Sequence, residues 1–449
     1  MVLLDPEPIH AARTWPVRCA FSVPGSRGPV RILEGRLENS KVVVYVVDIP
    51  EHFDRGGGLY TAENGLAWPD NIERFAAFSR AILRLALGQE GLGWRPQVLH
   101  CHDWQTGLAC MLLRGEPRRP ATIFTVHNMA YAGIGDRARF DALGLPPQLF
   151  TPEALEFYGN FSLLKGGLAG ADLITTVSPS YAREIQTPEL GFGLDGLLRH
   201  RRSTLTGIMN GVDYELWDPQ SDRHLPRHYN SRTLARKRDN KLALQRALGL
   251  EENHAALLFG VVSRLAHQKG IDLLLAAIPE LAGEPVQFAL LADGDPALHG
   301  ALVLVAQANP GQVAFVSGFN DALAHQIVAA ADALVMPSRY EPCGLAQLYA
   351  LRYGTVPVVR KTGGLGDSVR DATPQKLANG TATGIVFQDA TAAALTVALR
   401  RALELFMDKK VWLRLQRSGM KADFSWDASA QAYLELYRSA GNGRMDDRM

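Results

Sequence analysis

The chain alternates short runs of apolar residues with longer segments of mixed polarity. In the first half the apolar runs lie at residues 42–49, 98–101, 121–126, 173–177 and 205–209. In the second half they lie at residues 257–262, 288–292, 313–316, 333–336, 356–359 and 384–387. Runs of about four to eight apolar residues are typical of strands buried on both faces of a parallel sheet. Helical periodicity between the runs, as at 71–87 and 271–282, predicts βαβ units in two doubly wound, Rossmann-like α/β domains.

A polar segment from about residue 213 to 253 interrupts this alternation, with Pro219, Pro226 and many Arg and Lys residues. We interpret it as the connection between the two domains. The predicted organisation is a first domain, a linker, a second domain, and a C-terminal helix and tail, over residues 1–220, 221–253, 254–425 and 426–449. Ligands of doubly wound sheets bind beyond the carboxyl ends of the strands, so we expect a site in a deep cleft between the domains.

The amino-acid composition argues against several classes of protein. Lys and Arg number 47 against 46 Asp and Glu, which argues against a protein that binds nucleic acid or a membrane surface. The four cysteines form no C-x-x-C pair, which indicates a reduced, cytoplasmic protein. No basic region precedes the short apolar stretch at the N-terminus, and no run of about 18 apolar residues occurs. We therefore expect neither a signal peptide nor a transmembrane helix.

Cationic and acidic residues follow two apolar runs of the second half. Arg264 and Lys269 come after the run at 257–262, and Gly270 begins a helix. Cations between a strand end and a helix N-terminus suit a phosphate group, although a solvated basic loop is the favoured explanation of this pair taken alone. Glu341 follows the run at 333–336 in a turn stiffened by proline. Its carboxylate can bind sugar hydroxyls or stabilise positive charge on a sugar ring, or it can simply favour a helix N-terminus.

Three further features lie at predicted strand ends. Gly363 and Gly364 follow the run at 356–359, and adjacent glycines can turn backbone amides toward an anion. His100 and His102 share one face of a strand, but no third ligand with suitable spacing stands nearby, so we expect no metal site. His100 is also consistent with a histidine packed in the core. Asn210 precedes a glycine, which is a strong turn signal by itself.

Taken together, these segments resemble the bacterial and plant glycogen (starch) synthase family. The matching motifs are H-x-H-D-W at 100–104, T-V-H-N at 125–128, N-G-V-D at 210–213, S-R-L-x-x-Q-K-G at 263–270, G-D-P-x-L at 294–298, E-P-C-G-L at 341–345 and K-T-G-G-L-x-D at 361–367. They occur in the family's order and extend over roughly residues 40 to 440. E-P-C-G-L followed by T-G-G-L is the most specific part of the match.

The resemblance implies a glycosyltransferase of the GT-B architecture, with two Rossmann-like domains facing a deep cleft. Such an enzyme transfers glucose from ADP-glucose to the non-reducing end of an α-1,4-glucan such as glycogen, with retention of configuration. The family's bacterial-type motifs favour ADP-glucose over UDP-glucose. The resemblance implies no cofactor and no metal, and no partner beyond donor and acceptor; the oligomeric state stays open.

The resemblance also implies residue roles. Arg264 and Lys269 would bind the donor diphosphate in place of a metal ion. Glu341 would support the oxocarbenium-like transition state, and His127 would hold the glucose 6-hydroxyl. The remaining sugar-binding and nucleotide-binding positions that it implies are Asp103, Asn128, Asn210, Phe319, Tyr340, Cys343, Gly344, Leu345, Thr362, Gly363 and Gly364.

One family feature has no match. Members begin with a strand and a K-x-G-G-L loop, and residues 1–40 contain no such strand and loop. We therefore expect the first βα unit of the N-terminal domain to be missing, and one alternative is a shortened, weakly active or inactive glucan-binding relative. A second alternative is another retaining glycosyltransferase of the same fold. Many of those carry a second Glu eight residues after the first, where this chain has Tyr349. The absence of G-x-G-x-x-G after the first strand of either domain disfavours a dehydrogenase.

Overall fold

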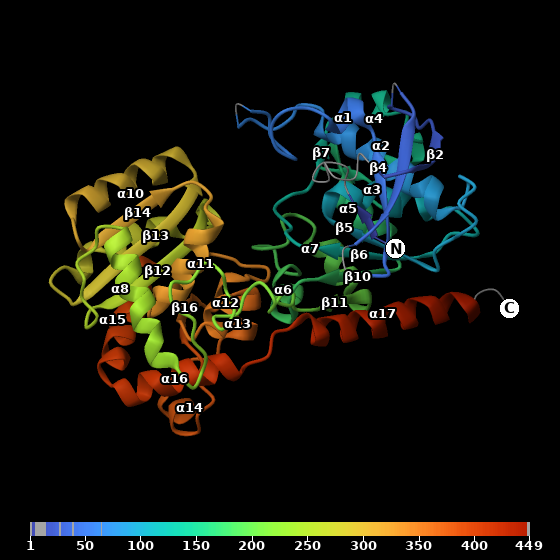
Figure 1. Ribbon diagram of the computed structural model, residues 1–449. Coiled ribbons are helices and arrows are strands. Elements are labelled where there is room, and N and C mark those ends of the chain that lie inside the picture. The colour runs from blue at the N-terminus through green and yellow to red at the C-terminus, as the bar shows by residue number, and fades with distance from the viewer. Residues whose placement is uncertain (1, 5–14, 27, 38–39, 64, 447–449) are drawn as a thin grey trace. The chain divides into compact units, whose positions relative to one another are not determined.

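The computed structural model describes residues 2–4, 15–26, 28–37, 40–63 and 65–446, and it contains two compact units (Figure 1). Unit 1 comprises residues 1–176, 185–206 and 434–449, and unit 2 comprises residues 177–184 and 207–433. Each unit is described separately below. None of the described helices is both long enough and apolar enough to cross a bilayer.

Unit 1 contains a parallel sheet in the order β11-β10-β6-β5. Its strands are β5 (Val98–His102), β6 (Ala121–Val126), β10 (Leu173–Thr176) and β11 (Leu205–Gly207). All six residues of β6 are buried, as the uninterrupted apolar run predicted. Helices α3 (Asp103–Leu113) and α5 (Leu163–Gly170) pack against each other beside it. Their contact depends on Gly107, because a Cβ atom there would lie 2.0 Å from the Leu163 carbonyl oxygen.

A second sheet of unit 1 has the order β1-β4-β3-β2. It consists of β1 (Val2–Leu4), β2 (Val17–Phe21), β3 (Val30–Arg36) and β4 (Val43–Asp48), with β4 parallel to β1 and antiparallel to β3. The run at 42–49 predicted β4, whereas the apolar pattern gave no sign of the three strands before it. The sequence of this region contains no K-x-G-G-L motif. The missing first βα unit therefore stays a prediction.

Further helices and a small sheet complete unit 1. It includes α1 (Pro50–Phe53), α2 (Asn71–Ala86), α4 (Arg137–Ala142) and α7 (Asp195–His200), and a small antiparallel sheet of β7 (Ile134–Gly135), β9 (Asn160–Ser162) and β8 (Glu156–Phe157). Helix α2 packs against α3. The helix predicted at 71–87 is therefore confirmed.

Unit 2 is built on a six-stranded, all-parallel sheet in the order β14-β13-β12-β15-β16-β17. The strands are β12 (Leu257–Leu265), β13 (Val286–Gly294), β14 (Val313–Ser317), β15 (Ala333–Met336), β16 (Val356–Arg360) and β17 (Ile385–Phe387). All six match predicted runs. The order reverses between β12 and β15, which makes this edge the switch point of a Rossmann-like sheet, where ligands bind.

Helices cover both faces of the unit 2 sheet. One face packs against α9 (Ile271–Ala277), α10 (Pro296–Ala308), α15 (Ala392–Met407) and α16 (Lys409–Lys421). The other packs against α8 (Lys237–Ala247), α11 (Asp321–Ala330) and α12 (Ala346–Arg352). The shorter helices α13 (Gly363–Ser368) and α14 (Pro374–Ala378) follow β16.

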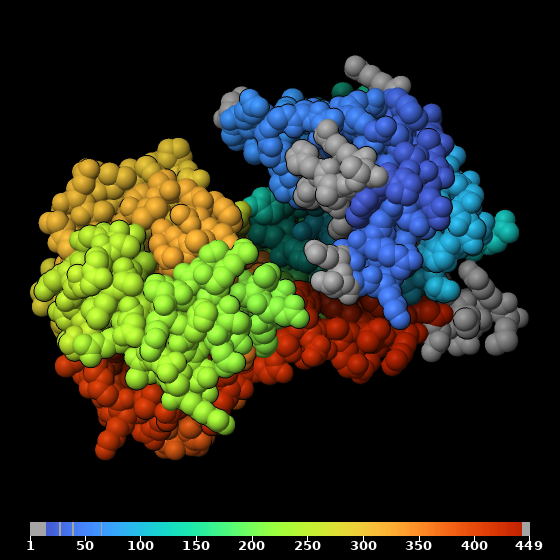
Figure 2. All heavy atoms as spheres, viewed as in Figure 1, coloured from blue at the N-terminus to red at the C-terminus, as the bar shows by residue number. Residues whose placement is uncertain are grey.

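The predicted linker at 221–253 differs from the structure, because this segment is part of unit 2 and contains α8. Its lime-green atoms lie on the surface of unit 2 in the space-filling view (Figure 2). The high Lys content suggested a solvated connection, yet Lys237 and Lys241 are buried. The Lys237 ammonium donates to the Ala329 carbonyl oxygen over 2.6 Å, and burial lowers its pKa to about 7. This backbone contact joins α8 to α11.

One other segment departs from the predicted domain ranges, and the C-terminal helix connects both units. Helix α6 (Pro179–Glu184) belongs to unit 2 although it lies within the predicted first domain. The Ser178 hydroxyl before it donates to the Pro342 carbonyl oxygen over 2.6 Å. Helix α17 (Trp426–Asp446) begins at the residue where the C-terminal helix was predicted; its first residues belong to unit 2, and from Leu434 onward it belongs to unit 1. A sequence pattern cannot show such returns of the chain, because they depend on tertiary packing.

Candidate active site

The carboxyl ends of β12, β15 and β16 carry most of the predicted site residues of unit 2. A short helical turn, His267–Lys269, follows β12 and ends at Gly270, whose φ angle is 65°. A Cβ atom at Gly270 would lie 2.2 Å from the Pro337 carbonyl oxygen. Only glycine allows the turn to approach the segment after β15 this closely. That approach brings Lys269 to Glu341.

Lys269 and Glu341 form a buried ion pair. The Lys269 ammonium lies 2.9 Å and 2.7 Å from the two carboxylate oxygens, and the Ser338 hydroxyl donates to Oε2 over 2.9 Å. The Glu341 residue is only 5% exposed. A buried charge is tolerated when a partner and hydrogen bonds compensate it. The carboxylate is therefore held in a fixed orientation beside a pocket of about 120 Å³, which also includes Ser263, Gly344 and Leu345.

The turn at 341–345 packs tightly against the start of α13. A Cβ atom at Gly363 would lie 2.0 Å from the Glu341 carbonyl oxygen, and one at Gly364 would lie 2.2 Å from that of Cys343. The Gly364 amide donates to the carbonyl oxygens of Glu341 and Pro342, each over 3.2 Å. The two glycines thus permit close backbone contact, and the Gly364 amide has protein acceptors in this structure.

The Gly363 amide donates to the Glu184 carboxylate over 2.8 Å, and the Thr362 hydroxyl lies 3.3 Å from the same group. The pKa of Glu184 is raised by burial, against the opposing effect of these hydrogen bonds. A carboxylate therefore occupies the anion position that the two glycines suggested. Sequence reasoning missed Glu184 because it lies on α6, far from α13 in the sequence.

The other predicted residues of unit 2 differ in exposure. Phe319 follows β14 and is 93% exposed, while Leu345 is partly exposed. Burial raises the pKa of the Cys343 thiol to about 12, against a hydrogen bond with the backbone of Asn210, so this thiol is neutral and packs in the protein. The carbonyl oxygen of Tyr340 accepts a hydrogen bond from the Gln268 side chain over 3.2 Å. Arg264 lies in β12, paired with Asp293 of β13 in the strand register.

In unit 1, Asp103 joins the ends of two strands. It begins α3 with a φ angle of 54°, and its Oδ1 accepts a hydrogen bond from the His127 amide over 2.7 Å. Burial raises the pKa of this carboxyl, while the charge of His127 and the amides of His127 and Asn128 oppose the shift. The Asn128 side chain accepts from the Ala130 amide over 3.1 Å. The structure therefore brings Asp103, His127 and Asn128 together.

Histidines surround this group. The ring nitrogens His102 Nδ1 and His127 Nε2 lie 3.0 Å apart, and both residues line a pocket of about 320 Å³. His100 contacts the hydroxyls of Thr125 and Tyr437 through its two ring nitrogens, at 2.6 Å and 2.8 Å. Burial, and then the charge of His127, lowers the pKa of His100 to about 4. The packed interpretation of His100 is supported, because neither ring nitrogen faces a vacant position.

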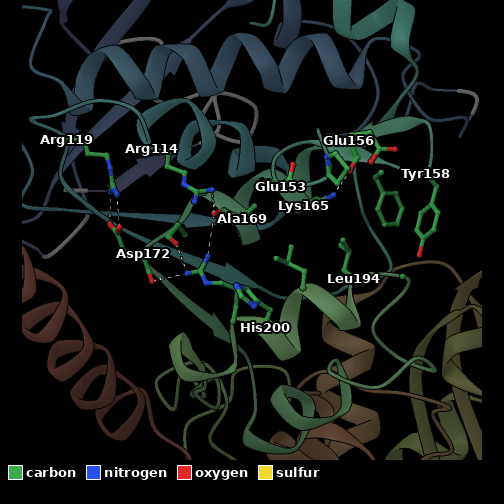
Figure 3. Close-up of a pocket in the computed structure, with 17 residues that line it drawn as sticks. Arg114, Arg119, Glu153, Glu156, Tyr158, Lys165, Ala169, Asp172, Leu194 and His200 are labelled. Carbon is green, nitrogen blue, oxygen red and sulfur yellow. Dashed lines mark hydrogen bonds and ion pairs between the residues drawn. The ribbon is translucent and has the colours of Figure 1, made fainter. Parts of the chain in front are cut away.

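Unit 1 also has a larger cavity of about 850 Å³ (Figure 3). Its cationic side chains are engaged by the protein. Arg119 forms a bidentate pair with Asp172, at 2.6 Å and 2.7 Å, and Arg114 donates to the Ala169 carbonyl oxygen over 3.2 Å. Arg201 donates to the carbonyl oxygens of Leu168 and Ala171. Arg114 and Arg201 stabilise the C-terminus of α5, and Arg119 neutralises Asp172 just after it, which explains these cations without a ligand.

Comparison with known proteins places these features in a family. The starch synthase catalytic domain family matches residues 6–200, and the family of glycosyl transferases group 1 matches residues 247–411. Glycogen synthase 1 of Methylococcus capsulatus is 49% identical over 97% of this chain and 88% of the relative. The glycogen synthase of Thioalkalivibrio sulfidiphilus is 52% identical over 93% of this chain and 87% of the relative.

A solved structure of a starch synthase has a similar fold. The catalytic domain of starch synthase IV from Arabidopsis thaliana, bound to ADP and acarbose, superposes with a TM-score of 0.86 and is 32% identical. The match covers 98% of this chain and 92% of that one. The predicted GT-B class, with two Rossmann-like α/β domains, is confirmed at the level of the fold. The chain belongs to the glycogen (starch) synthase family of glycosyltransferases.

Proposed function

We propose that the chain transfers glucose from ADP-glucose to the non-reducing end of an α-1,4-glucan such as glycogen, with retention of configuration. The buried Lys269–Glu341 pair, at the switch point of the unit 2 sheet, is the observation that carries this proposal. It supplies a cation for a phosphate and a carboxylate for a sugar in one fixed arrangement. The glycogen synthases that share about half of its residues support the choice of reaction.

On the donor side, we assign the diphosphate to Arg264 and Lys269. Lysine carries three donor hydrogens, so Lys269 can contact a phosphate while it keeps a hydrogen bond to Glu341. Gly363 and Thr362 then bind phosphate oxygens in place of the Glu184 carboxylate, since both prefer an anion there. The exposed ring of Phe319 suits stacking on a flat base, with Tyr340 and Gly364 completing the nucleotide site.

On the sugar side, we assign the transferred glucose to Glu341 and His127. The C1–O bond to the diphosphate breaks and ADP leaves, while the 4-hydroxyl oxygen of the acceptor bonds to C1 and gives up its proton. The positive charge that develops on the ring is stabilised by the oriented Glu341 carboxylate. His127 has an imidazole that can hydrogen-bond a hydroxyl, and the adjacent Asp103 fixes its backbone. Asn128, Asn210 and the 343–345 turn line the rest of the sugar site.

Donor preference gives a direct experiment. The purified chain is supplied with glycogen and with ¹⁴C-glucose carried on either ADP or UDP, without added metal. We expect incorporation from ADP-glucose at a much higher rate than from UDP-glucose. The ADP-bound plant structure supports the adenine nucleotide. A higher rate from UDP-glucose would overturn the donor assignment, and no incorporation by a folded chain that still binds ADP would indicate a glucan-binding relative.

A further inference from the structure

Three side chains with metal-binding atoms meet on unit 2, and none is part of the proposed active site. His224 lies in the loop before α8, while Asp321 and His325 lie one turn apart on α11. Their ligand atoms all lie within 4.8 Å of one another. His224 Nε2 is 3.8 Å from Asp321 Oδ2, and His325 Nε2 is 3.9 Å from Asp321 Oδ1. These distances are too long for hydrogen bonds.

A buried carboxylate fixes the proton on His325. Its Nδ1 lies 2.8 Å from Oδ2 of Asp222, which also accepts a hydrogen bond from the Tyr353 hydroxyl over 2.6 Å. The other oxygen of Asp222 accepts a hydrogen bond from the His224 amide over 2.9 Å. Because Nδ1 donates to this carboxylate, the lone pair is on Nε2, the ring nitrogen that faces Asp321. Metal-binding histidines use this arrangement.

His224 also has its Nε2 lone pair available. Arg223 Nε donates to His224 Nε2 over a long 3.4 Å, so this nitrogen carries a lone pair as well. Arg223 is exposed and can turn into solvent when another cation takes its place. The ring of His325 stacks on Trp217, with centroids 3.6 Å apart and planes at 14°. One ligand is therefore rigid, and the other two can close on it.

The three ligand atoms face one another at distances too long for a hydrogen bond, which leaves room for a cation between them. In a tetrahedral site with metal–ligand bonds of 2.0–2.1 Å, the ligand atoms lie about 3.4 Å apart. The observed 3.8 Å and 3.9 Å reach this spacing with a small movement of Asp321, whose side chain is 58% exposed. Two imidazoles and one carboxylate suit Zn²⁺ and related ions better than Mg²⁺ or Ca²⁺, which prefer oxygen ligands.

We propose that His224, Asp321 and His325 bind a divalent transition-metal ion, with Zn²⁺ the best fit and water as the fourth ligand. Asp222 acts behind His325 as its hydrogen-bond partner. The ion joins the loop that carries His224 to the first turn of α11. Its role is to stabilise this part of unit 2, and it takes no part in glucosyl transfer.

The test uses the full chain, stripped of metal with a chelator and then titrated with Zn²⁺ by calorimetry and with Co²⁺ by visible absorption. We expect one ion per chain and the intense absorption bands of tetrahedral Co²⁺. His224→Gln and Asp321→Asn should each weaken binding by at least about tenfold, since even partners behind the ligands contribute 10–100-fold. Both positions are accessible enough that the variants should fold. His254→Gln, at an exposed histidine of the same unit, should bind like the unmodified chain.

Two results would overturn the proposal. If His224→Gln and Asp321→Asn bind Zn²⁺ as tightly as the unmodified chain, then the ion lies elsewhere. If the unmodified chain binds neither ion at millimolar concentration, then a proton on a histidine balances the three groups. Neither result depends on glucosyl transfer, so the metal site and the proposed function can fail separately.

Discussion

Lys269 has two tasks in this account, and they can be separated experimentally. Its ammonium compensates the buried Glu341 carboxylate, and it offers a cation to the donor diphosphate. The first task concerns folding, because removal of one partner from a buried pair costs about 3–5 kcal/mol. The second concerns binding, because a hydrogen bond between charged groups contributes about 1.5–3 kcal/mol.

We expect Lys269→Ala to weaken ADP binding by about 10–100-fold, which is the free energy of one charge-assisted contact to phosphate. The variant should also be less stable, because Glu341 is left unpaired. Combining it with Glu341→Gln should restore stability but not affinity. Calorimetric titration with ADP, together with thermal unfolding, measures both. Lys410→Ala, at an exposed lysine of the same unit, is the control. Unchanged ADP affinity in Lys269→Ala would remove Lys269 from the diphosphate site.

His100 predicts a pH dependence of stability. The pKa of His100 falls from 6.5 to about 4 on folding. Between these two pH values the imidazole is protonated in the unfolded chain and neutral in the folded chain. The contribution of His100 to the free energy of unfolding is complete above pH 6.5 and is lost as the pH falls toward 4. It amounts to up to roughly 3 kcal/mol. His100→Gln should unfold earlier at pH 8 but lose less stability between pH 6.5 and pH 4. Thermal unfolding of both proteins at a series of pH values measures this difference. The same loss of stability between pH 6.5 and pH 4 in the variant and in the unmodified chain would contradict the prediction.

At the residue scale, the sequence predicted the parts of the site that follow a strand directly. Lys269 and Glu341 each come after a predicted strand of one sheet, and adjacent strand ends must lie close together. Glu184 was unpredictable because its helix joins unit 2 only through tertiary packing. The trio of His224, Asp321 and His325 was equally hidden, since two of its members gain their geometry from the buried Asp222.

Helix α5 illustrates how an element is completed from outside. Its last carbonyl groups have no partner within the helix, and Arg201 donates to those of Leu168 and Ala171 over 2.9 Å and 2.8 Å. The guanidinium also complements the negative end of the helix dipole. The cavity in Figure 3 is thus bordered by groups that stabilise α5.

We expect Arg201→Ala to lower the free energy of unfolding by about 2 kcal/mol, because several charge-assisted hydrogen bonds are lost. The neighbouring Arg202→Ala, at an exposed position, should change it by less than about 0.5 kcal/mol. Denaturant unfolding of the two variants measures the difference. Equal stabilities would show that Arg201 does not stabilise α5.

Elements were predicted well where burial is two-sided. The six strands of the unit 2 sheet contain continuous apolar runs, and the sequence pattern predicted each of them. The hairpin of β2 and β3 was missed because many of its residues are at least partly exposed and it includes charged pairs such as Arg18 with Glu34. Helix α8 was read as a linker because its lysines look solvated in the sequence, although two of them are buried.

At the scale of the whole molecule, the chain returns to unit 1 through α17. Ala440 of this helix is buried against Ala121 and Ile123 of β6, with Leu436 and Tyr437 partly buried beside them. We expect Tyr437→Ala to destabilise unit 1 by about 2–4 kcal/mol, because a packed ring and a hydrogen bond to His100 are lost. Glu435→Ala, at an exposed position of α17, is the control. Equal unfolding curves for the two variants would contradict the packing role of Tyr437.

The central claim is that Glu341 stabilises the transition state of glucosyl transfer. The decisive measurement compares the unmodified chain with Glu341→Gln for ¹⁴C-glucose incorporation from ADP-glucose into glycogen, alongside ADP binding by calorimetry. Removal of a charge that acts mainly in the transition state should lower the rate by at least about 10²–10³-fold and leave ADP affinity within a few-fold. Glu404→Gln, at an exposed glutamate, should transfer at the unmodified rate. An unmodified rate in Glu341→Gln would contradict the account and move the reaction away from this carboxylate.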